Sequence, residues 1–186
     1  MSDALLAYLD AHPAHHETCE RWPVQGTMRV RLSLASTLPP AHVSSSILAI
    51  VFNDDLRVLY LWPTTPSGSI AHFLIGGRPE PGETPEQTAT REVAEETGWR
   101  VRPIGMIGFR HFFQPEPRAP ETDRPYPDFI QPIYAARAQA FDERLILPGD
   151  RIEATFIDCA DAERATDEAQ RPLLKAALSA ARADAG

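Results

Sequence analysis

The chain has few of the residues that mark several large protein classes. Its only cysteines, Cys19 and Cys159, are too few for a disulfide framework or a cysteine-rich zinc site. Its longest apolar run, residues 47–52, is far too short to cross a bilayer. The first residues carry an early acid and no basic segment, which is not typical of a secretory signal. We therefore expect a cytoplasmic protein with reduced thiols and no membrane partner.

Positive charge is also scarce. Lys175 is the single lysine, the arginines are scattered, and the formal net charge is −8. A protein that follows a nucleic-acid backbone needs a basic stripe on its surface, so this balance argues against a general nucleic-acid binder. A length of 186 residues is typical of one domain that buries a substantial core.

The hydrophobic pattern predicts strands alternating with a few helices. Residues 2–11 predict a helix that begins after Ser2, and residues 28–36 form a candidate strand within an ambiguous stretch, 15–37. Pro39 and Pro40 interrupt the pattern, so we interpret residues 1–40 as an N-terminal extension and 41–186 as the main domain. Further strands are predicted at 43–53, 57–62, 71–75, 99–113, 129–139 and 152–158. Residues 115–127 predict a surface loop, and 160–183 a helix broken near Pro172.

Residues 77–99 are the most informative part of the chain. They read G-R-P-E-P-G-E-T-P-E-Q-T-A-T-R-E-V-A-E-E-T-G-W, a loop followed by a helix predicted over 85–97. Thr84 is placed to cap this helix and Gln87 completes a capping box. Pro85 suits the first helical position, and Gly98 suits a left-handed C-terminal cap. These signals fix which residues of the helix share a face.

One face of this helix gathers acids that do not help it fold. Glu92, Glu95 and Glu96 have the i, i+3, i+4 spacing that places them within about 5–6 Å of each other, and each like-charge pair costs roughly 0.2–0.5 kcal/mol. They lie near the helix C-terminus, where the dipole disfavours acids. A bound divalent cation reverses both penalties, and freed loop carbonyls such as that of Gly76 add oxygen donors.

The same residues resemble the Nudix box, G-x5-E-x7-R-E-U-x-E-E-x-G-U, in which U is a bulky apolar residue. The box positions of this chain are filled by Gly77, Glu83, Arg91, Glu92, Val93, Glu95, Glu96, Gly98 and Trp99. Trp99 is bulkier than the usual residue, a departure that bears on packing rather than on chemistry. The resemblance implies an α/β/α sandwich with a mixed β-sheet.

The resemblance also implies roles for the residues of the box. Glu92 and Glu96 are expected to bind Mg²⁺, with Mn²⁺ able to substitute, and Glu95 to act as a further metal ligand or as the base. Arg91 is expected to hold the loop residue Glu83, although a simple i+4 pair with Glu95 is the alternative reading. In this family the base can instead come from a later loop. The candidates are Glu116, Glu121 and Glu143, and the alternative for each is that it is only a surface acid. Glu80 and Glu86 are interpreted as solvated.

The activity implied is Mg²⁺-dependent hydrolysis of a diphosphate linkage in a nucleoside diphosphate derivative, such as ADP-ribose, a sugar nucleotide or a nucleotide triphosphate. The alternative is a nucleotide-sensing module on the same fold that does not turn over its ligand. Phe112, Phe113 and Tyr126 are weak candidates for stacking on a base, with packing as the other reading. Family members are often dimers, so residues 1–40 are a candidate for part of a homodimer interface.

Overall fold

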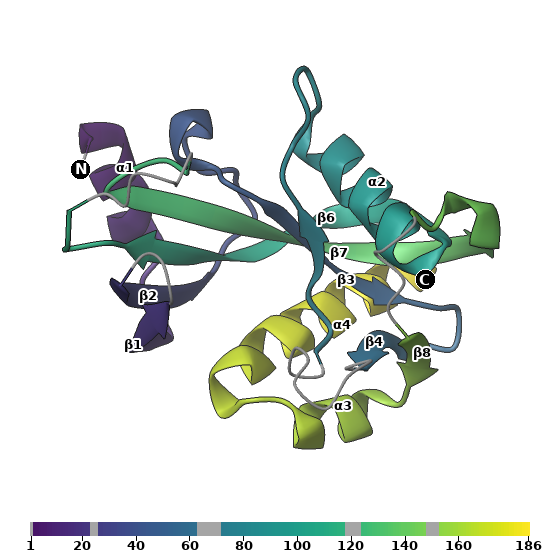
Figure 1. The fold of residues 1–186 in the computed structure, drawn as a ribbon. Helices are drawn as coiled ribbons and strands as arrows, with labels where there is room; N and C mark the ends of the chain where they lie inside the picture. The colour runs from purple at the N-terminus through teal and green to yellow at the C-terminus, as the bar shows by residue number, and fades with distance from the viewer. Residues whose placement is uncertain (1, 23–25, 63–71, 118–123, 148–152) are drawn as a thin grey trace.

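The computed structural model describes residues 2–22, 26–62, 72–117, 124–147 and 153–186, which form a mixed α/β fold (Figure 1). The helices are α1 (Asp3–Ala11), α2 (Pro85–Thr97), α3 (Cys159–Ala165) and α4 (Arg171–Ala185), with short 3₁₀ turns η1 (Ala41–Val43), η2 (Glu143–Leu145) and η3 (Glu168–Gln170). The strands are β1 (His16–Trp22), β2 (Gly26–Leu34), β3 (Ile47–Phe52), β4 (Val58–Trp62), β5 (Ile75–Gly77), β6 (Trp99–Phe113), β7 (Asp128–Phe141) and β8 (Glu153–Ile157).

The strands form one mixed sheet in the order β1-β2-β6-β7-β3-β4-β8, and β5 pairs with one end of β3. The central pair, β3 and β7, is parallel, with Leu48 opposite Ile133. The other strand pairs in the described part of the chain are antiparallel. All six residues of β3 are buried, as expected for a strand covered on both faces.

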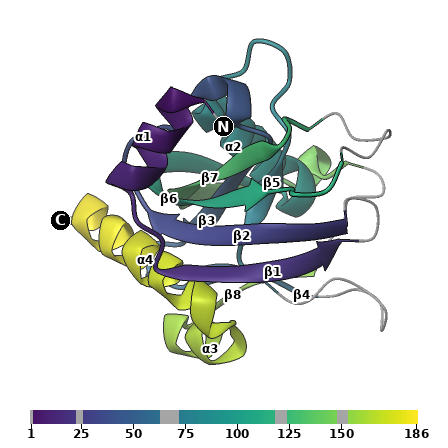
Figure 2. The same cartoon turned by 90° about the vertical axis from the view of Figure 1, so that its left-hand side faces the viewer.

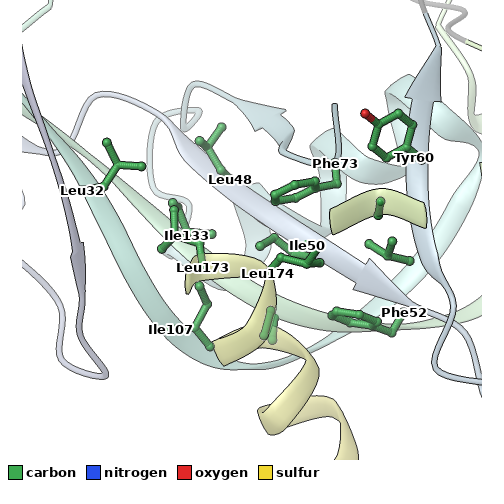
Figure 3. Close-up of a cluster of buried hydrophobic side chains, with 14 of the residues drawn as sticks. Leu32, Leu48, Ile50, Phe52, Tyr60, Phe73, Ile107, Ile133, Leu173 and Leu174 are labelled. Atoms are coloured by element: carbon green, nitrogen blue, oxygen red, sulfur yellow. The ribbon is translucent and has the colours of Figure 1, made fainter. Parts of the chain in front are cut away.

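Helices cover both faces of this sheet, which confirms the α/β/α sandwich (Figure 2). On the α2 face, Ala89 and Val93 of α2 pack with Leu5 and Leu9 of α1 in one apolar cluster. On the α4 face, a second cluster includes Leu173 and Leu174 beside Leu48, Ile50 and Ile133 (Figure 3). No helix in the described part of the chain is long and apolar enough to cross a membrane.

The N-terminal residues share the sheet and core of the rest of the chain. The helix predicted at 2–11 is confirmed, and the hydroxyl of Ser2 accepts a hydrogen bond from the Leu5 amide. The ambiguous stretch holds the hairpin β1–β2, and β2 pairs with β6, Val30 lying opposite Phe112. Cys19 and Cys159 are both free thiols.

Three boundaries differ from the sequence predictions. A strand was expected at residues 71–75, the first of which lies outside the described residues; the structure has β5 at Ile75–Gly77, because the backbone partners on β3 lie opposite the two glycines. The strand expected from residue 43 begins at Ile47, after the turn η1. The C-terminal helix is broken at residues 166–170, where Asp167 caps η3, and Pro172 instead lies in the first turn of α4.

Candidate active site

The helix α2 carries the acidic residues and is held at both ends as predicted. The Thr84 hydroxyl accepts a hydrogen bond from the Gln87 amide at 3.3 Å, and the Gln87 side chain accepts one from the Thr84 amide at 2.8 Å. Gly98 has a φ of 77° in the left-handed region and donates its amide to Ala94. Both caps fix the helical register, so the expected acidic face is present.

Glu83 is fixed in the loop before α2 by four hydrogen bonds. Arg91 donates from Nε to Glu83 Oε1 at 2.7 Å and from Nη2 to Oε2 at 3.0 Å. The Thr88 hydroxyl and the Glu80 amide also donate to Oε2, at 2.9 and 2.8 Å. The hydrogen bonds from Arg91, followed by that from the Glu80 backbone, lower the pKa of Glu83 to about 2. Glu83 is therefore ionised at any pH near neutrality.

Arg91 also contacts two acids of its own helix. Its Nη1 donates to Glu92 Oε1 at 3.0 Å and to Glu95 Oε2 at 2.9 Å, and Nη2 donates to the Arg78 carbonyl at 2.8 Å. The geometry thus contains both pairings considered from the sequence, the loop pair and the i+4 pair. The three carboxylates around Arg91 carry three negative charges against its single positive charge, an excess of two. Glu96 is not included in this count.

The backbone before the loop is shaped around Glu92. A Cβ atom at Gly77 would lie 2.5 Å from the Glu92 carboxylate, so any other residue at this position would displace that group. Gly76 has a φ of 149°, and a Cβ there would overlap the Ile47 carbonyl. Burial raises the pKa of Glu92, an effect that the hydrogen bond and charge of Arg91 only partly offset. The Glu92 carboxylate therefore lies against the backbone at Gly77, and Arg91 does not fully compensate the cost of burying its negative charge.

These donors fit a hard divalent cation. Carboxylate and carbonyl oxygens are the ligands of Mg²⁺, and the uncompensated charge around Glu92 is what such an ion neutralises. The acids have not converged on a common point, however: among the described residues, no three His, Cys, Asp or Glu side chains form a ready metal-binding group. Arg91 instead binds three of the acids, and its bonds to Glu92 and Glu95 each engage one carboxylate oxygen.

Of the two candidate bases from later loops that the structure describes, Glu143 is the one placed beside α2. It begins η2, and this segment is tied to the helix end by bonds from the Leu147 amide to the Glu95 carbonyl and from the Asp142 amide to the Gly98 carbonyl. Glu116 instead follows the opposite end of β6 and contacts Gly26 and Thr27 of the β1–β2 hairpin. Glu121 lies outside the described residues.

The three candidates for base stacking have different surroundings. Phe112 is completely buried and stacks on Phe129 with ring centroids 4.6 Å apart, so core packing occupies it. Phe113 points to the opposite face of the sheet, beneath the guanidinium of Arg29. Tyr126 is exposed and donates its hydroxyl to the Glu116 carbonyl.

Sequence reasoning missed several partners of the acidic residues. Thr88 and the Arg78 carbonyl complete the surroundings of Glu83 and Arg91, and the spacing of the chain gave no signal for either. Glu86 is exposed, as interpreted from the sequence, but it also accepts a hydrogen bond from the buried Tyr134 at 3.0 Å. That contact joins strand β7, far away in the sequence, to the first turn of α2.

Comparison with known proteins assigns the chain to a family. The model of the NUDIX domain matches residues 43–177, which is most of the chain. The chain therefore belongs to the Nudix family and is a Nudix-type hydrolase, as its resemblance to the Nudix box implies.

Two solved structures are similar in fold. A NUDIX hydrolase from Nitrosomonas europaea is 22% identical with a TM-score of 0.51, over 76% of this chain and 90% of that one. The pyrophosphohydrolase BsRppH from Bacillus subtilis is 15% identical with a TM-score of 0.55, over 91% of this chain and 97% of that one. At these identities the likeness shows the shared fold.

Proposed function

We propose that this protein is a Mg²⁺-dependent pyrophosphohydrolase that cleaves the diphosphate linkage of a nucleoside diphosphate derivative. The observation that carries the proposal is the excess of negative charge at α2, where Glu83, Glu92 and Glu95 share one arginine and Glu96 lies one turn beyond Glu92. A stable helix gains nothing from this arrangement, whereas a site for a cation and a diphosphate requires it.

The residues divide into ligands and supports. Glu92 and Glu96, with Glu95 and the Gly76 carbonyl, are the groups that hold Mg²⁺ or Mn²⁺ in this proposal. When bound, such an ion would supply positive charge for the diphosphate and would lower the pKa of a water molecule. Glu83 keeps Arg91 oriented through two parallel hydrogen bonds, and Arg91 in turn holds Glu95 and Glu92 near the ion. Glu95 or Glu143 accepts the proton of the water.

The test is turnover of ADP-ribose, sugar nucleotides and nucleotide triphosphates with and without Mg²⁺, with products identified by mass. We expect Glu96→Gln to lower turnover by about 10²–10⁴, the range for a positioned charged or basic group. The matched control is Glu168→Gln, the same substitution at an exposed acid of η3, which should keep full activity.

Two results contradict the proposal. Retained activity in Glu96→Gln, with the fold verified by circular dichroism, removes that residue from the site. Tight nucleotide binding by the wild type without any Mg²⁺-dependent product favours the alternative of a sensing module.

A further inference from the structure

A pocket of about 460 Å³ lies on the hairpin β1–β2, and we call it the hairpin pocket. Its walls come from β1, β2 and the last residues of β6. The hairpin and α2 lie on opposite sides of the molecule (Figures 1 and 2). The hairpin also precedes residues 43–177, which the model of the NUDIX domain matches. The hairpin pocket is therefore separate from the acidic site, and its size suits a small molecule.

The hairpin pocket opens on the sheet face opposite α4. Val30 of β2 and Phe112 of β6 belong to the α4-face cluster, so the residues next to them along each strand point to the other face. On that face, Tyr8 of α1 covers Phe109, with ring centroids 5.1 Å apart. His111 is the next residue of β6 on this face, and it borders the pocket. The pocket thus begins just beyond the part of the sheet that α1 covers.

Arg29 brings a positive charge to the pocket that no acid balances. It borders the pocket, is exposed to solvent and lies opposite Phe113, with its guanidinium 5.7 Å from the ring centroid. A contact with an aromatic ring leaves that charge in place. Within the described ranges, no aspartate or glutamate forms an ion pair with Arg29. A ligand in the pocket can therefore reach a guanidinium whose charge is uncompensated.

The other charged residues that border the pocket already have partners. Glu17 Oε1 lies 3.0 Å from Arg31 Nε, an ion pair in which that N–H is not aligned as a hydrogen bond. His111 is 2% exposed and its Nε2 lies 2.9 Å from Asp128 Oδ1. Asp128 is 3% exposed and does not itself border the pocket. The charges of these residues are therefore balanced within each pair.

Two more charges lie at the outer end of the hairpin and oppose each other. Arg21 of β1 is exposed and lies opposite Thr27 of β2. Glu116 accepts a hydrogen bond from the Thr27 amide at 3.4 Å. Neither Arg21 nor Glu116 borders the pocket. The excess charge at the pocket is therefore that of Arg29.

These features select a small anion. A neutral ligand would leave the charge of Arg29 uncompensated, and a cation would be repelled by it. A polyanion such as a nucleic acid is disfavoured by the net charge of −8, which repels each further phosphate. The pocket is larger than a bare ion, and the ring of Phe113 adds an apolar wall. A ligand with an acid group and an organic body uses both.

We propose that the hairpin pocket binds a small organic molecule through one acid group, a phosphate ester or a carboxylate, which the guanidiniums of Arg29 and Arg31 hold. Both acid groups present paired oxygens that match the planar fork of a guanidinium. Glu17 is the acid that competes with the ligand for Arg31. The site takes no part in hydrolysis, so the proposal does not depend on the pyrophosphohydrolase function.

The two free thiols of the chain provide the assay. Cys19 borders the pocket and lies opposite Arg29, whereas Cys159 donates to the Leu56 carbonyl beside α3. A ligand in the pocket should slow labelling of Cys19 by N-ethylmaleimide, an uncharged reagent, and leave Cys159 unchanged. Mass spectrometry of the peptides measures both rates in one sample. The buffer contains EDTA and no Mg²⁺, so no ligand binds through a metal at α2.

Four probes separate the acid group from the organic body. Phenyl phosphate and benzoate carry the two acid groups on the same ring, and the better of them identifies the acid that the site takes. Benzamide has the ring without the charge, and inorganic phosphate has the charge without the ring. We expect protection of Cys19 by phenyl phosphate or benzoate, and much weaker protection by the other two probes.

The variants are compared by the probe concentration that halves the labelling rate of Cys19, which does not depend on each variant's unprotected rate. Arg29→Met should raise this concentration by about 10- to 150-fold, the equivalent of 1.5–3 kcal/mol for hydrogen bonds to a charged group. Glu17→Gln should lower it, because Arg31 is then released for the ligand. Arg102→Met is the matched control and should leave it unchanged, since Arg102 lies on β6 but pairs with Asp184.

Several results would overturn the proposal. They are the absence of protection by both acids, equal protection by benzamide or by inorganic phosphate, and equal half-protection in Arg29→Met and the wild type. Weaker binding in Glu17→Gln would also contradict it, since partial unfolding cannot produce the tighter binding that we expect. Slower labelling of Cys159 in parallel with Cys19 would show an effect on the whole protein instead of a ligand in the pocket.

Discussion

At the scale of single residues, Arg91 organises the acidic end of α2. It bonds Glu83, Glu92 and Glu95 at 2.7 to 3.0 Å while its own side chain is only 21% exposed. Its planar fork reaches the loop and two turns of helix at once, which the point charge of a lysine does not do. The guanidinium therefore sets the position of the acids before any ligand arrives.

Arg91 should also control the ionisation of Glu83. In the wild type, carboxyl NMR should show Glu83 titrating near its lowered pKa of about 2. Because the folded pKa lies below the unfolded value, ionised Glu83 favours the folded state above about pH 4.3, and this contribution is lost as the pH falls through the folded pKa. Arg91→Met removes the largest cause and should move the titration back toward the ordinary range.

The control for that titration is Arg164→Met, which removes an exposed arginine that pairs with Asp161 in α3. A Glu83 titration that stays in place in Arg91→Met would show that the Glu80 amide and Thr88 hold the carboxylate by themselves.

The acids of α2 could be identified from the sequence because their positions depend on local spacing. Thr84, Gln87 and Gly98 fix a helix within a short stretch, and the helix fixes the face. The bond from Tyr134 to Glu86 could not be found in this way. It forms only because the fold brings β7 to the first turn of α2, and a lone tyrosine in a strand carries no signal of that packing.

At the scale of elements, α2 is held by its caps and by the segment that follows β7. The bonds to Glu95 and Gly98 attach η2 to the helix C-terminus. The aromatic rings of Trp99, Phe141 and Phe156 then pack beside the helix exit, with centroid separations of 5.5 and 5.1 Å from Trp99. The bulky residue at the last box position thus joins α2 to strands β7 and β8.

The capping box should contribute measurably to this element. Thr84→Ala removes the hydroxyl that receives the Gln87 amide and should lower the free energy of unfolding by about 1 kcal/mol, measured by urea denaturation. Thr90→Ala is the matched control, because that hydroxyl bonds to the Glu86 carbonyl within the helix and caps no helix end. An equal loss in both variants would mean that the cap itself contributes nothing.

Most elements could be predicted, and those that differed have a common cause. The apolar runs of β3, β4, β6 and β7 and the capped helices give local signals that the structure confirms. The hairpin β1–β2 was ambiguous because β1 is an edge strand that carries three charged residues and has none that is fully buried. The extent of β5 depended on its partner, since only pairing with Ile47 and Leu48 makes Gly76 and Gly77 strand residues.

At the scale of the whole molecule, the N-terminal helix is part of the core. Leu9 is 3% exposed and belongs to the same cluster as Ala89 and Val93 of α2. Leu9→Ala should therefore lower the free energy of unfolding of the entire protein by about 2–5 kcal/mol, in a single transition. Leu6→Ala, an exposed leucine of the same helix, should change it little.

Urea unfolding followed by both circular dichroism and tryptophan fluorescence measures this. Two separated transitions in the wild type, with only the first shifted by Leu9→Ala, would show instead that residues 1–40 fold as the separate extension first interpreted from the sequence.

The parallel pair at the centre of the sheet has a consequence for biosynthesis. Strand β3 is completely apolar, and its partner on one edge, β7, is made only after the ribosome has added α2 and β6. Until then the nascent polypeptide exposes an apolar strand with one unpaired edge, to which other chains can add by β-sheet pairing. Because partners so distant in sequence must meet before the sheet closes, we expect slow refolding and a need for chaperones during synthesis.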